Sequence, residues 1–358
     1  MESPQHAQPE VSSMLNGHDI LITGATGSFG RRCCLEILKR YAPKRLIVFS
    51  RDELKQSEMQ SDPAFQHPAM RFFLGDVRDK ERLKKAMAGV DYAIHAAALK
   101  QVPAAEYNPH EFIKTNINGA MNVVDAAIDA GVKKVIALST DKAVNPVNLY
   151  GATKLCSDKI FVAANSYSGK NPTRFSVVRY GNVVGSRGSV LPCFYKQRNT
   201  GTITVTDLAM TRFLITLRES VDFVLNAMSQ MMGGEIFVPK LPSCTLKEMA
   251  QAVAPDCKQE TIGLRPGEKM HETLIPADEA HLTLEFDEHF IIQPMLPFWQ
   301  SEATNLGGRT CKTGFSYASN NNKQRLSRQA LQDMCEEIGI PTEVSPESAR
   351  FEPASCAN

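Results

Sequence analysis

The sequence lacks several features that would indicate particular classes of protein. Its 358 residues carry a formal net charge of only +1 at pH 7, so nothing favours nucleic acid or an anionic membrane as a partner. No apolar run approaches the ~18 residues that a membrane-spanning helix needs. The first residues are polar and contain no apolar signal core, so we expect a disordered tail over residues 1–16.

The cysteines and histidines show no metal-ligand spacing. Nine cysteines are scattered along the chain, and none forms a Cys-x-x-Cys motif. We therefore expect free thiols, a reducing cytoplasmic location and no metal site. His95 ends a predicted strand, where a core or hydrogen-bonded histidine is the expected interpretation.

Short apolar segments alternate with helical stretches over the first half of the chain. The expected strands are 20–22, 45–49, 71–74, 92–94, 135–138 and 175–179. The expected helices are 29–40, a long stretch over about 109–130, and 150 to about 164. Strands that are apolar throughout are typical of a parallel sheet covered on both faces. The sequence therefore predicts an α/β fold with a Rossmann-type, doubly wound parallel sheet.

The regular alternation stops after the last of these strands. We interpret residues 17–185 as a dinucleotide-binding domain and residues 186–300 as a smaller α/β lobe, interleaved with the first, that binds the substrate. A late helix is expected at about 325–339, within a C-terminal extension over 301–340. Residues 341–358 are rich in Pro, Ser and Glu and are expected to be flexible.

A glycine-rich segment follows the first predicted strand and opens the first predicted helix. Glycines at such a turn let a pyrophosphate approach the backbone, and the helix N-terminus offers free N–H groups. We expect this segment to bind a dinucleotide cofactor through Thr23, Gly24, Thr26, Gly27, Ser28, Phe29 and Gly30.

The end of the second strand bears on which dinucleotide is bound. NAD enzymes usually place a carboxylate there to hold the ribose 2′-OH. This chain instead has Ser50 and Arg51, with Lys55 one turn later. Because cationic groups suit a 2′-phosphate, we expect NADP. Asp52 is the competing carboxylate, although it could cap the next helix instead.

The third strand is followed by Asp76 and Val77. These residues are placed to meet the adenine of the cofactor. A helix-capping turn is an equally good interpretation of the same two residues.

Tyr150 and Lys154 are one helical turn apart and therefore share a helix face. The pKa of a free tyrosine is near ~10, and a neighbouring ammonium and a positive nicotinamide would lower it. We expect Tyr150 to take a hydroxyl proton while hydride leaves the same carbon.

The fifth strand ends in Ser139-Thr140-Asp141-Lys142. Elimination of water needs an acid for the leaving hydroxyl and a base for a carbon-bound proton. Asp141 is the candidate acid and Lys142 the candidate base. We expect burial beside Lys154 and the cofactor charge to lower the pKa of Lys142, because the base must be neutral. An ordinary salt bridge between Asp141 and Lys142 is the alternative.

Over residues 17–290 the chain resembles the extended short-chain dehydrogenase/reductase superfamily, and within it the inverting UDP-N-acetylglucosamine 4,6-dehydratases of pseudaminic acid biosynthesis. The resemblance is carried by residues 23–30, 50–56, 95–103, 139–143, 150–154, 179–183 and 265–269. It implies a hydro-lyase that oxidises C4, eliminates water and reduces C6 with a tightly held NADP, so that no net redox change occurs.

The resemblance also implies roles for further residues. Ala96, Ala97, Ala98 and Lys100 would lie where cofactor and sugar meet, and Thr140 would hydrogen-bond the substrate. The remaining substrate contacts are expected from Asn182, Arg187, Val190, Thr204, Arg212, Arg265 and Glu268. Glu268, Lys269 and Glu272 could instead form a surface charge network.

The expected partners are UDP-N-acetylglucosamine and further copies of the chain, which would pair through the helices around 107–130 and 150–165. Two related activities stay open, a nucleotide-sugar 4-epimerase and a retaining 4,6-dehydratase. A non-catalytic, NADP-sensing scaffold is the alternative from a different class.

Overall fold

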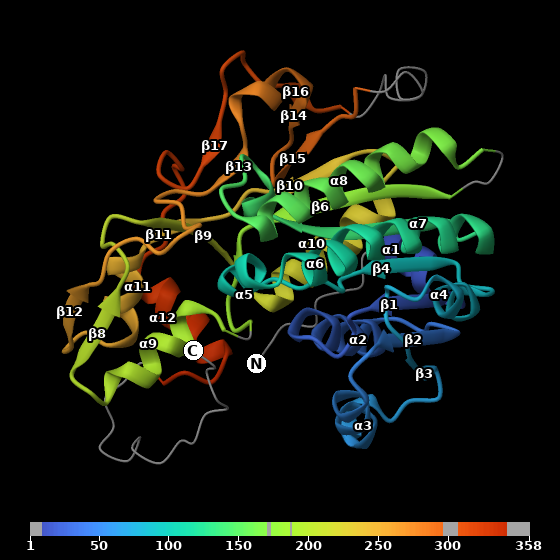
Figure 1. The fold of residues 1–358 in the computed structure, drawn as a ribbon, viewed down its shortest axis with the longest axis horizontal. Coiled ribbons are helices and arrows are strands. Elements are labelled where there is room, and N and C mark those ends of the chain that lie inside the picture. The colour runs from blue at the N-terminus through green and yellow to red at the C-terminus, as the bar shows by residue number, and fades with distance from the viewer. Residues whose placement is uncertain (1–8, 170–172, 187, 296–306, 342–358) are drawn as a thin grey trace.

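A computed structural model describes residues 9–169, 173–186, 188–295 and 307–341 of the protein. A ten-stranded sheet runs through its centre in the order β16-β14-β15-β10-β6-β5-β4-β1-β2-β3 (Figure 1). The parallel strands are β3 (Met70–Leu74), β2 (Arg45–Ser50), β1 (Asp19–Thr23), β4 (Tyr92–His95), β5 (Lys134–Thr140), β6 (Arg174–Tyr180) and β10 (Ile236–Pro239). The antiparallel strands are β15 (His289–Ile292), β14 (Thr283–Glu285) and β16 (Arg309–Thr310).

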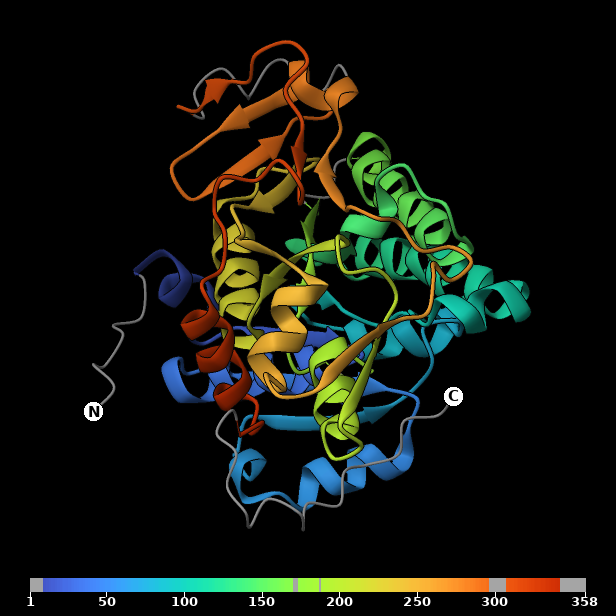
Figure 2. The ribbon, with the colours of Figure 1, turned by 90° about the vertical axis from the view of Figure 1, so that its left-hand side faces the viewer.

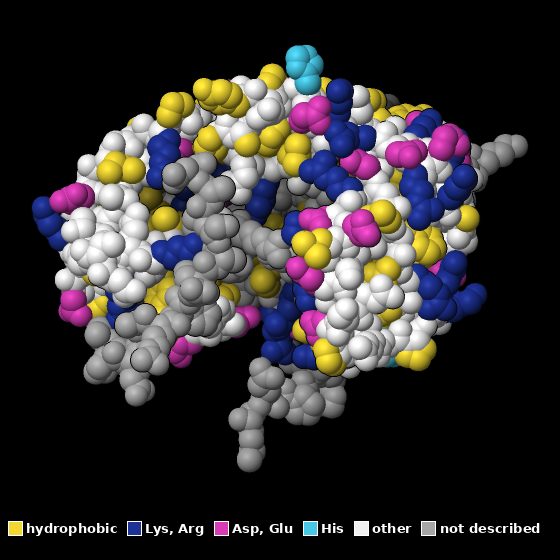
Figure 3. Space-filling model, turned by 60° about the horizontal axis from the view of Figure 1, so that its bottom comes forward, with side chains coloured by type: hydrophobic (Ala, Val, Ile, Leu, Met, Phe, Trp, Pro, Cys, Tyr) yellow, Lys and Arg dark blue, Asp and Glu magenta, His cyan; other side chains and the backbone are white. Residues whose placement is uncertain are grey.

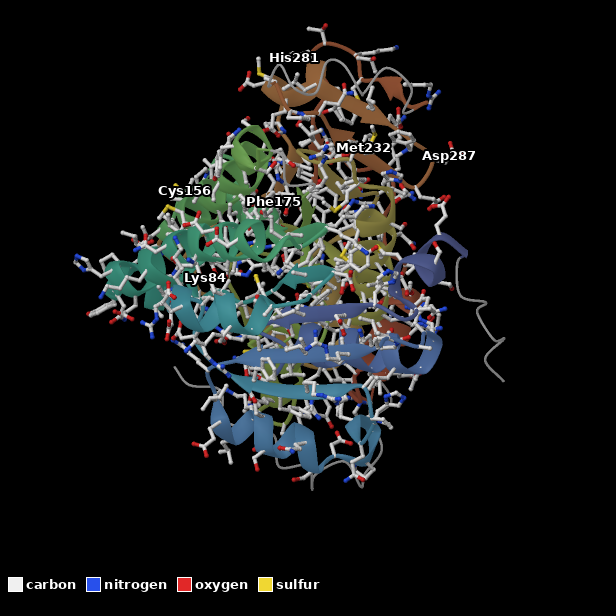
Figure 4. The ribbon with its side chains drawn as sticks, turned by 90° about the vertical axis from the view of Figure 1, so that its right-hand side faces the viewer. Lys84, Cys156, Phe175, Met232, His281 and Asp287 are labelled. Carbon is white, nitrogen blue, oxygen red and sulfur yellow. The ribbon has the colours of Figure 1, made fainter. Side chains whose placement is uncertain are left out.

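The expected parallel strands are confirmed, each extended by one to three residues. They form because their apolar residues can be buried on both faces of the sheet, and every residue of β1 is buried. In Figure 4, Phe175 of β6 lies inside the protein, whereas Lys84 and Cys156 lie on outer helix surfaces. None of the described cysteines forms a disulfide.

Helices cover both faces of this sheet. On one face α4 (Lys80–Met87) packs on α7 (Gly119–Ala130), which packs on α8 (Leu149–Tyr167). On the other face α2 (Ser28–Arg40) packs on α10 (Leu217–Gln230). The expected long helical stretch is α6 (Pro109–Phe112), a π-helical segment (Ile113–Asn118) and α7. Shorter helices are α3 (Glu53–Ser61), α5 (Val102–Tyr107) and the 3₁₀ segments Pro63–Phe65, Asp141–Ala143 and Ala277–Leu282.

The N-terminal segment differs from the expected disordered tail. Residues 9–15 form helix α1 (Pro9–Leu15), which packs on α10. Val11 and Leu15 are fully buried, and Met14 is nearly so. These residues share one helix face, so the segment docks despite its polar composition. The prediction weighed composition and missed this spacing.

A smaller lobe stands beside the carboxyl end of the main sheet, at the left of Figure 1. It contains β7 (Asn182–Val183), α9 (Val190–Arg198), β8 (Thr202–Val205), β9 (Thr211–Ile215), β11 (Ser243–Thr245), α11 (Leu246–Val253) and β12 (Lys258–Thr261). Its strands pair as β11-β9-β7 and β12-β8. A separate core around Leu191, Phe194, Ile203 and Met249 stabilises the lobe.

The late helix is α12 (Arg328–Glu337), somewhat shorter than expected. It packs against α11, with Leu331 in the core of the smaller lobe (Figure 2). The two-stranded pair of β13 (Thr273–Ile275) and β17 (Tyr317–Ala318) links this C-terminal part to the rest of the chain. Within the described ranges, no helix combines the length and apolar character required to span a bilayer.

Candidate active site

The order of the parallel strands reverses between β1 and β4, since β2 and β3 lie on one side of β1 and the later strands on the other. Crossovers diverge at such a point and leave a crevice at the carboxyl ends of the strands. Four of the predicted site segments lie at this edge, because each directly follows or ends a parallel strand. They are the glycine segment, Ser50, Ala96 to Ala98 and the Thr140 region.

The glycine segment forms a tight turn between β1 and α2. Gly24 has a φ of 67°, and a Cβ atom placed there would lie 2.8 Å from the backbone of Ala97. A Cβ on Gly30 would lie 2.4 Å from the Cα of Ala25. Gly27 stands at the N-cap and has no side chain to cover the first turn of α2. The turn is therefore a backbone cradle that fits a pyrophosphate. Thr26, Ser28 and Phe29 lie in the same turn.

Hydrogen bonds fasten this cradle to the end of β4. The Thr23 hydroxyl accepts a hydrogen bond of 3.2 Å from Ala97 N–H and shares one of 2.8 Å with Nδ1 of His95. Burial, together with the charge of Lys154, lowers the pKa of His95 to about 3. His95 is thus a neutral, hydrogen-bonded core residue, as predicted. The described residues contain no cluster of His, Cys, Asp or Glu that fits a metal ion.

At the end of β2, the carboxylate of Asp52 is used to cap a helix. Asp52 accepts a 3.0 Å hydrogen bond from Lys55 N–H at the start of α3 and forms an ion pair with the ammonium of Lys55. Ser50 is buried and accepts a 3.1 Å hydrogen bond from Gln56. The side chain of Arg51 is 52% exposed, and its Nη1 lies 3.7 Å from Oδ2 of Asp76, so the cation at this strand end is loosely paired and open to solvent.

Asp76 forms a turn after β3, but it does not cap the next helix, because the N-cap of α4 is Asp79. It accepts a 2.9 Å hydrogen bond from Arg78 N–H and pairs with the Arg78 guanidinium at 2.8 Å. Burial opposes ionisation of Asp76, but the bonds from Arg78 outweigh it and lower the pKa. Val77 is buried against Gly119 of α7.

The main chain turns sharply where β5 ends. The Thr140 hydroxyl donates a 2.9 Å hydrogen bond to Oδ1 of Asp141, which also lies 3.0 Å from Nζ of Lys142. Asp141 is fully buried. One carboxylate oxygen, Oδ1, is therefore occupied, and the other, Oδ2, is buried without a hydrogen-bond partner in the described part of the chain.

Lys142 lies between carboxylates from two parts of the chain. Its Nζ is 3.5 Å from Oε1 of Glu272 and 3.5 Å from Oδ1 of Asn182, besides the contact with Asp141. Burial acts to lower the pKa of Lys142, but Asp141 and then Glu272 outweigh it and raise that pKa. The predicted lowering is therefore wrong, because it omitted a second carboxylate.

Helix α8 brings Tyr150 onto this turn. Asn148 caps the helix by accepting a 2.8 Å hydrogen bond from Gly151 N–H. A Cβ on Gly151 would lie only 2.1 Å from the carbonyl oxygen of Lys142, so glycine permits this docking. Burial raises the pKa of Tyr150 to about 12, against the opposing charge of Lys142. The expected lowering by Lys154 is wrong for the protein alone.

The ammonium of Lys154 is directed at the strand rather than at the tyrosine. It donates a 2.7 Å hydrogen bond to the carbonyl of Leu138. Burial lowers the pKa of Lys154, although Asp158 acts in the opposite direction. Lys100 lies in the loop after β4 and is exposed to solvent. Partial burial and then the charge of Lys142 lower its pKa.

The residues expected at the nucleotide end are dispersed over the smaller lobe. The structure brings Asn182 and Arg212 to the Lys142 cluster, with Arg212 Nε 4.0 Å from Glu272. Arg265 is exposed on a turn, and Glu268 has a buried Oε2 without a hydrogen-bond partner in the described chain.

Two other predicted contacts lie on α9 and β8. Val190 begins α9, and the Thr204 hydroxyl accepts a 2.9 Å hydrogen bond from Gln197. Arg187 lies outside the described residues. Figure 3 shows the surface hollowed between the two lobes, with Lys and Arg side chains gathered beside the hollow.

Sequence reasoning missed Glu272. It is only 2% exposed and is not part of a surface charge network. A signal was available, since Glu272 lies two residues before the buried Leu274 of β13 and residues at this spacing share one face of an extended segment.

Comparisons with known proteins agree with this geometry. The family described as polysaccharide biosynthesis protein matches residues 20–294. A UDP-N-acetylglucosamine 4,6-dehydratase (inverting) of Campylobacter jejuni is 55% identical over 90% of this chain and 98% of its own length. A UDP-glucose 4-epimerase of Rickettsia conorii is 46% identical over 73% of this chain and 78% of its own length.

Solved structures show the same fold. Pen from Bacillus thuringiensis has a TM-score of 0.83 and 36% identity, covering 92% of this chain and 99% of that one. DesIV, a dTDP-glucose 4,6-dehydratase from Streptomyces venezuelae solved with NAD and TYD, has a TM-score of 0.62 and 21% identity, covering 70% and 86%. The resemblance inferred from the motifs is confirmed: the chain belongs to the polysaccharide biosynthesis protein family, within the extended short-chain dehydrogenases/reductases.

Proposed function

We propose that this protein is a UDP-N-acetylglucosamine 4,6-dehydratase, a hydro-lyase that inverts C5 of the sugar. The observation that carries the proposal is the Asp141–Lys142 pair, which lies beside Tyr150 at the carboxyl edge of a dinucleotide-binding sheet. The 55% identity to a relative with that name supports it.

The two reacting residues of the elimination are already in contact. Transfer of the ammonium proton of Lys142 across 3.0 Å to Asp141 leaves a neutral amine and a protonated carboxyl. These are the base and the acid that the elimination needs. We propose that Oδ2 of Asp141, which has no hydrogen-bond partner among the described residues, meets the C6 hydroxyl of the bound sugar.

Each proton has a residue to carry it. Tyr150 takes the proton of the C4 hydroxyl, with Thr140 holding that oxygen. Lys142 takes the C5 proton, which the C4 ketone makes acidic, and Asp141 protonates the C6 hydroxyl as it leaves as water. C5 is then reprotonated from the opposite face, which inverts that carbon. When bound, the nicotinamide accepts hydride from C4 and returns it at C6, and its positive charge lowers the pKa of Tyr150.

We propose NADP as the cofactor, held at its pyrophosphate by the cradle of residues 23–30 and at its ribose by Ser50 and Arg51. The support is that Asp52 is occupied as a helix cap, while Arg51 is exposed and only loosely paired with Asp76, at 3.7 Å. Lys55 already forms an ion pair with Asp52, so we propose that it contributes less than Arg51 to binding of the 2′-phosphate. Asp76, Val77, Ala96, Ala97, Ala98, Lys100 and Lys154 complete the proposed cofactor contacts.

The UDP part of the substrate would lie along the smaller lobe. Asn182 and Arg212 are the best supported contacts, because they lie beside Lys142 and Glu272. We also propose Arg265 and Glu268 as contacts, because their turn lies next to the start of α8. There the side chain of Asn148 donates a 2.7 Å hydrogen bond to the carbonyl of Gly267. Lys100, Thr140, Arg187, Val190 and Thr204 stay in the proposal on the motif resemblance.

Three wider assignments belong to the same proposal. We propose a cytoplasmic enzyme of pseudaminic acid biosynthesis, supported by described cysteines that form no disulfide. We also propose a homo-oligomer that pairs through α7 and α8. Met121 and Tyr167 on these helices have exposed apolar surface, 43% and 56%, which such pairing would cover.

Incubation with UDP-N-acetylglucosamine, followed by mass spectrometry of the sugar nucleotide, tests the function. We expect a product lighter by one water. A product of unchanged mass that is the C4 epimer would favour the 4-epimerase instead, which the Rickettsia relatives make the second candidate. Cofactor binding without any turnover would favour the sensing scaffold.

A further inference from the structure

Glu272 lies beside the proposed base and has no part in the mechanism above. Its Oε1 is 3.5 Å from Nζ of Lys142 and 4.0 Å from Nε of Arg212, and its Oε2 is 3.8 Å from Nζ of Lys269. Oε2 is buried and has no hydrogen-bond partner in the described part of the chain. A carboxylate in such a position acts on its neighbours mainly through its charge.

The backbone around Glu272 is anchored independently of Lys142. Its N–H donates a 2.9 Å hydrogen bond to the Ser319 hydroxyl, and Ser319 N–H donates one of 2.8 Å to the carbonyl of Glu272. The Ser319 hydroxyl is also 2.7 Å from the hydroxyl of Thr211 on β9. The C-terminal part of the chain therefore fixes where Glu272 meets the turn after β5.

Charged and titratable groups face Lys142 from every element around it. They are Asp141 in its own turn, Tyr150 on α8, Arg212 on β9, Lys269 and Glu272 before β13, and Lys100 after β4. Among the charged groups of the described residues, Asp141 and Glu272 are the two that attract its ammonium, and both lie within 3.5 Å. The charge of Glu272 therefore competes directly with loss of the Lys142 proton.

We propose that Glu272 is a positioning residue, which anchors Lys142 beside Asp141 and sets how readily that lysine gives up its proton. The effect of Glu272 on the reaction rests on the proposed function, because it requires Lys142 to be the base. The competition between Glu272 and deprotonation of Lys142 is a property of the protein alone.

Trace labelling of amines tests it directly. The protein is treated at pH 8 with a small amount of acetic anhydride, and labelling of Lys142 relative to the exposed Lys39 is measured by mass spectrometry. Only the neutral amine reacts, so Glu272→Gln should raise the relative labelling of Lys142 at least about tenfold, which corresponds to one pKa unit. Glu260→Gln, the same change at an exposed carboxylate, should leave it unaltered. Equal labelling in wild type and Glu272→Gln would overturn the proposal.

Glu272→Asp covers the case in which Glu272→Gln does not fold. It moves the carboxylate away from Lys142 by one methylene, so the relative labelling of Lys142 should rise less, by about threefold. Labelling equal to that of the wild type would overturn the proposal. In the reaction, the pH profile of kcat rises as the general base loses its proton. This rising, low-pH limb should move to lower pH by about one unit in Glu272→Gln. An enzyme that forms no dehydrated sugar would sink the proposed function, while the labelling would still decide the role of Glu272.

Discussion

Replacement of Gly151 by alanine should damage catalysis far more than stability. The added Cβ would lie 2.1 Å from the carbonyl oxygen of Lys142, whereas ordinary van der Waals contact begins at 3.4 Å. Helix α8 and the turn after β5 must therefore separate by about 1 Å. Overpacking of this kind costs about 1–3 kcal/mol, or a melting temperature lower by about 2–8 °C.

The catalytic consequence follows from the same displacement. A shift of about 1 Å between reacting groups can cost about 100-fold in rate, and here it would separate Tyr150 from Asp141 and Lys142. We expect kcat to fall about 100-fold in Gly151→Ala, measured as formation of the dehydrated sugar. The retained fold is checked by thermal melting.

Gly131→Ala is the matched control. Gly131 ends α7 with a φ of 68°, and a Cβ there would meet nothing within 4 Å. The left-handed backbone should cost about 1–2 kcal/mol without moving the site, so kcat should stay near that of the wild type. If Gly151→Ala keeps kcat within threefold of the wild type, the account of how α8 docks is refuted.

Three further predictions test individual residues. Arg51→Asp should shrink the preference for NADP over NAD by about 1–3 kcal/mol in titrations with each cofactor; equal affinity of the wild type for both would exclude NADP selection. Tyr150→Phe should leave the bound cofactor oxidised when substrate is added and lower turnover at least about 100-fold, so faster turnover would remove Tyr150 as the base. Burial holds the pKa of His95 near about 3, below its ordinary value. Its contribution to the free energy of unfolding should therefore be fully present above pH ~6.5 and be lost as the pH falls towards 3. The decline should approach about 1.4 kcal/mol per pH unit in urea unfolding and be shallower in His95→Gln; equal slopes would contradict a neutral His95.

Local signals predicted most of the fold. The apolar strands and the glycine turn lie in short segments whose periodicity and residue types decide their conformation, so the parallel sheet and the cradle followed from the sequence. Helix α1 was missed although its signal is local, because Ser12 and Ser13 separate Val11 from Met14 and Leu15 in a segment that is polar overall.

The protonation behaviour of the site was not predictable in the same way. The pKa values of Lys142 and Tyr150 depend on burial and on Glu272, which comes from a distant part of the chain. The motif placed Tyr150 and Lys154 on one helix face, but it did not show that Lys154 donates to the carbonyl of Leu138. Charges that meet only through tertiary contacts leave no short-range pattern in a sequence.

The central claim is that Lys142 removes the C5 proton and that the sugar is reprotonated from the other face. Turnover of UDP-N-acetylglucosamine in D₂O, followed by NMR of the product, tests it most directly. The account predicts one deuterium at C5, inverted configuration at that carbon, and transfer of a C4 deuterium label to C6. A dehydrated product with unchanged C5 configuration would contradict it and assign the protein to the retaining dehydratases.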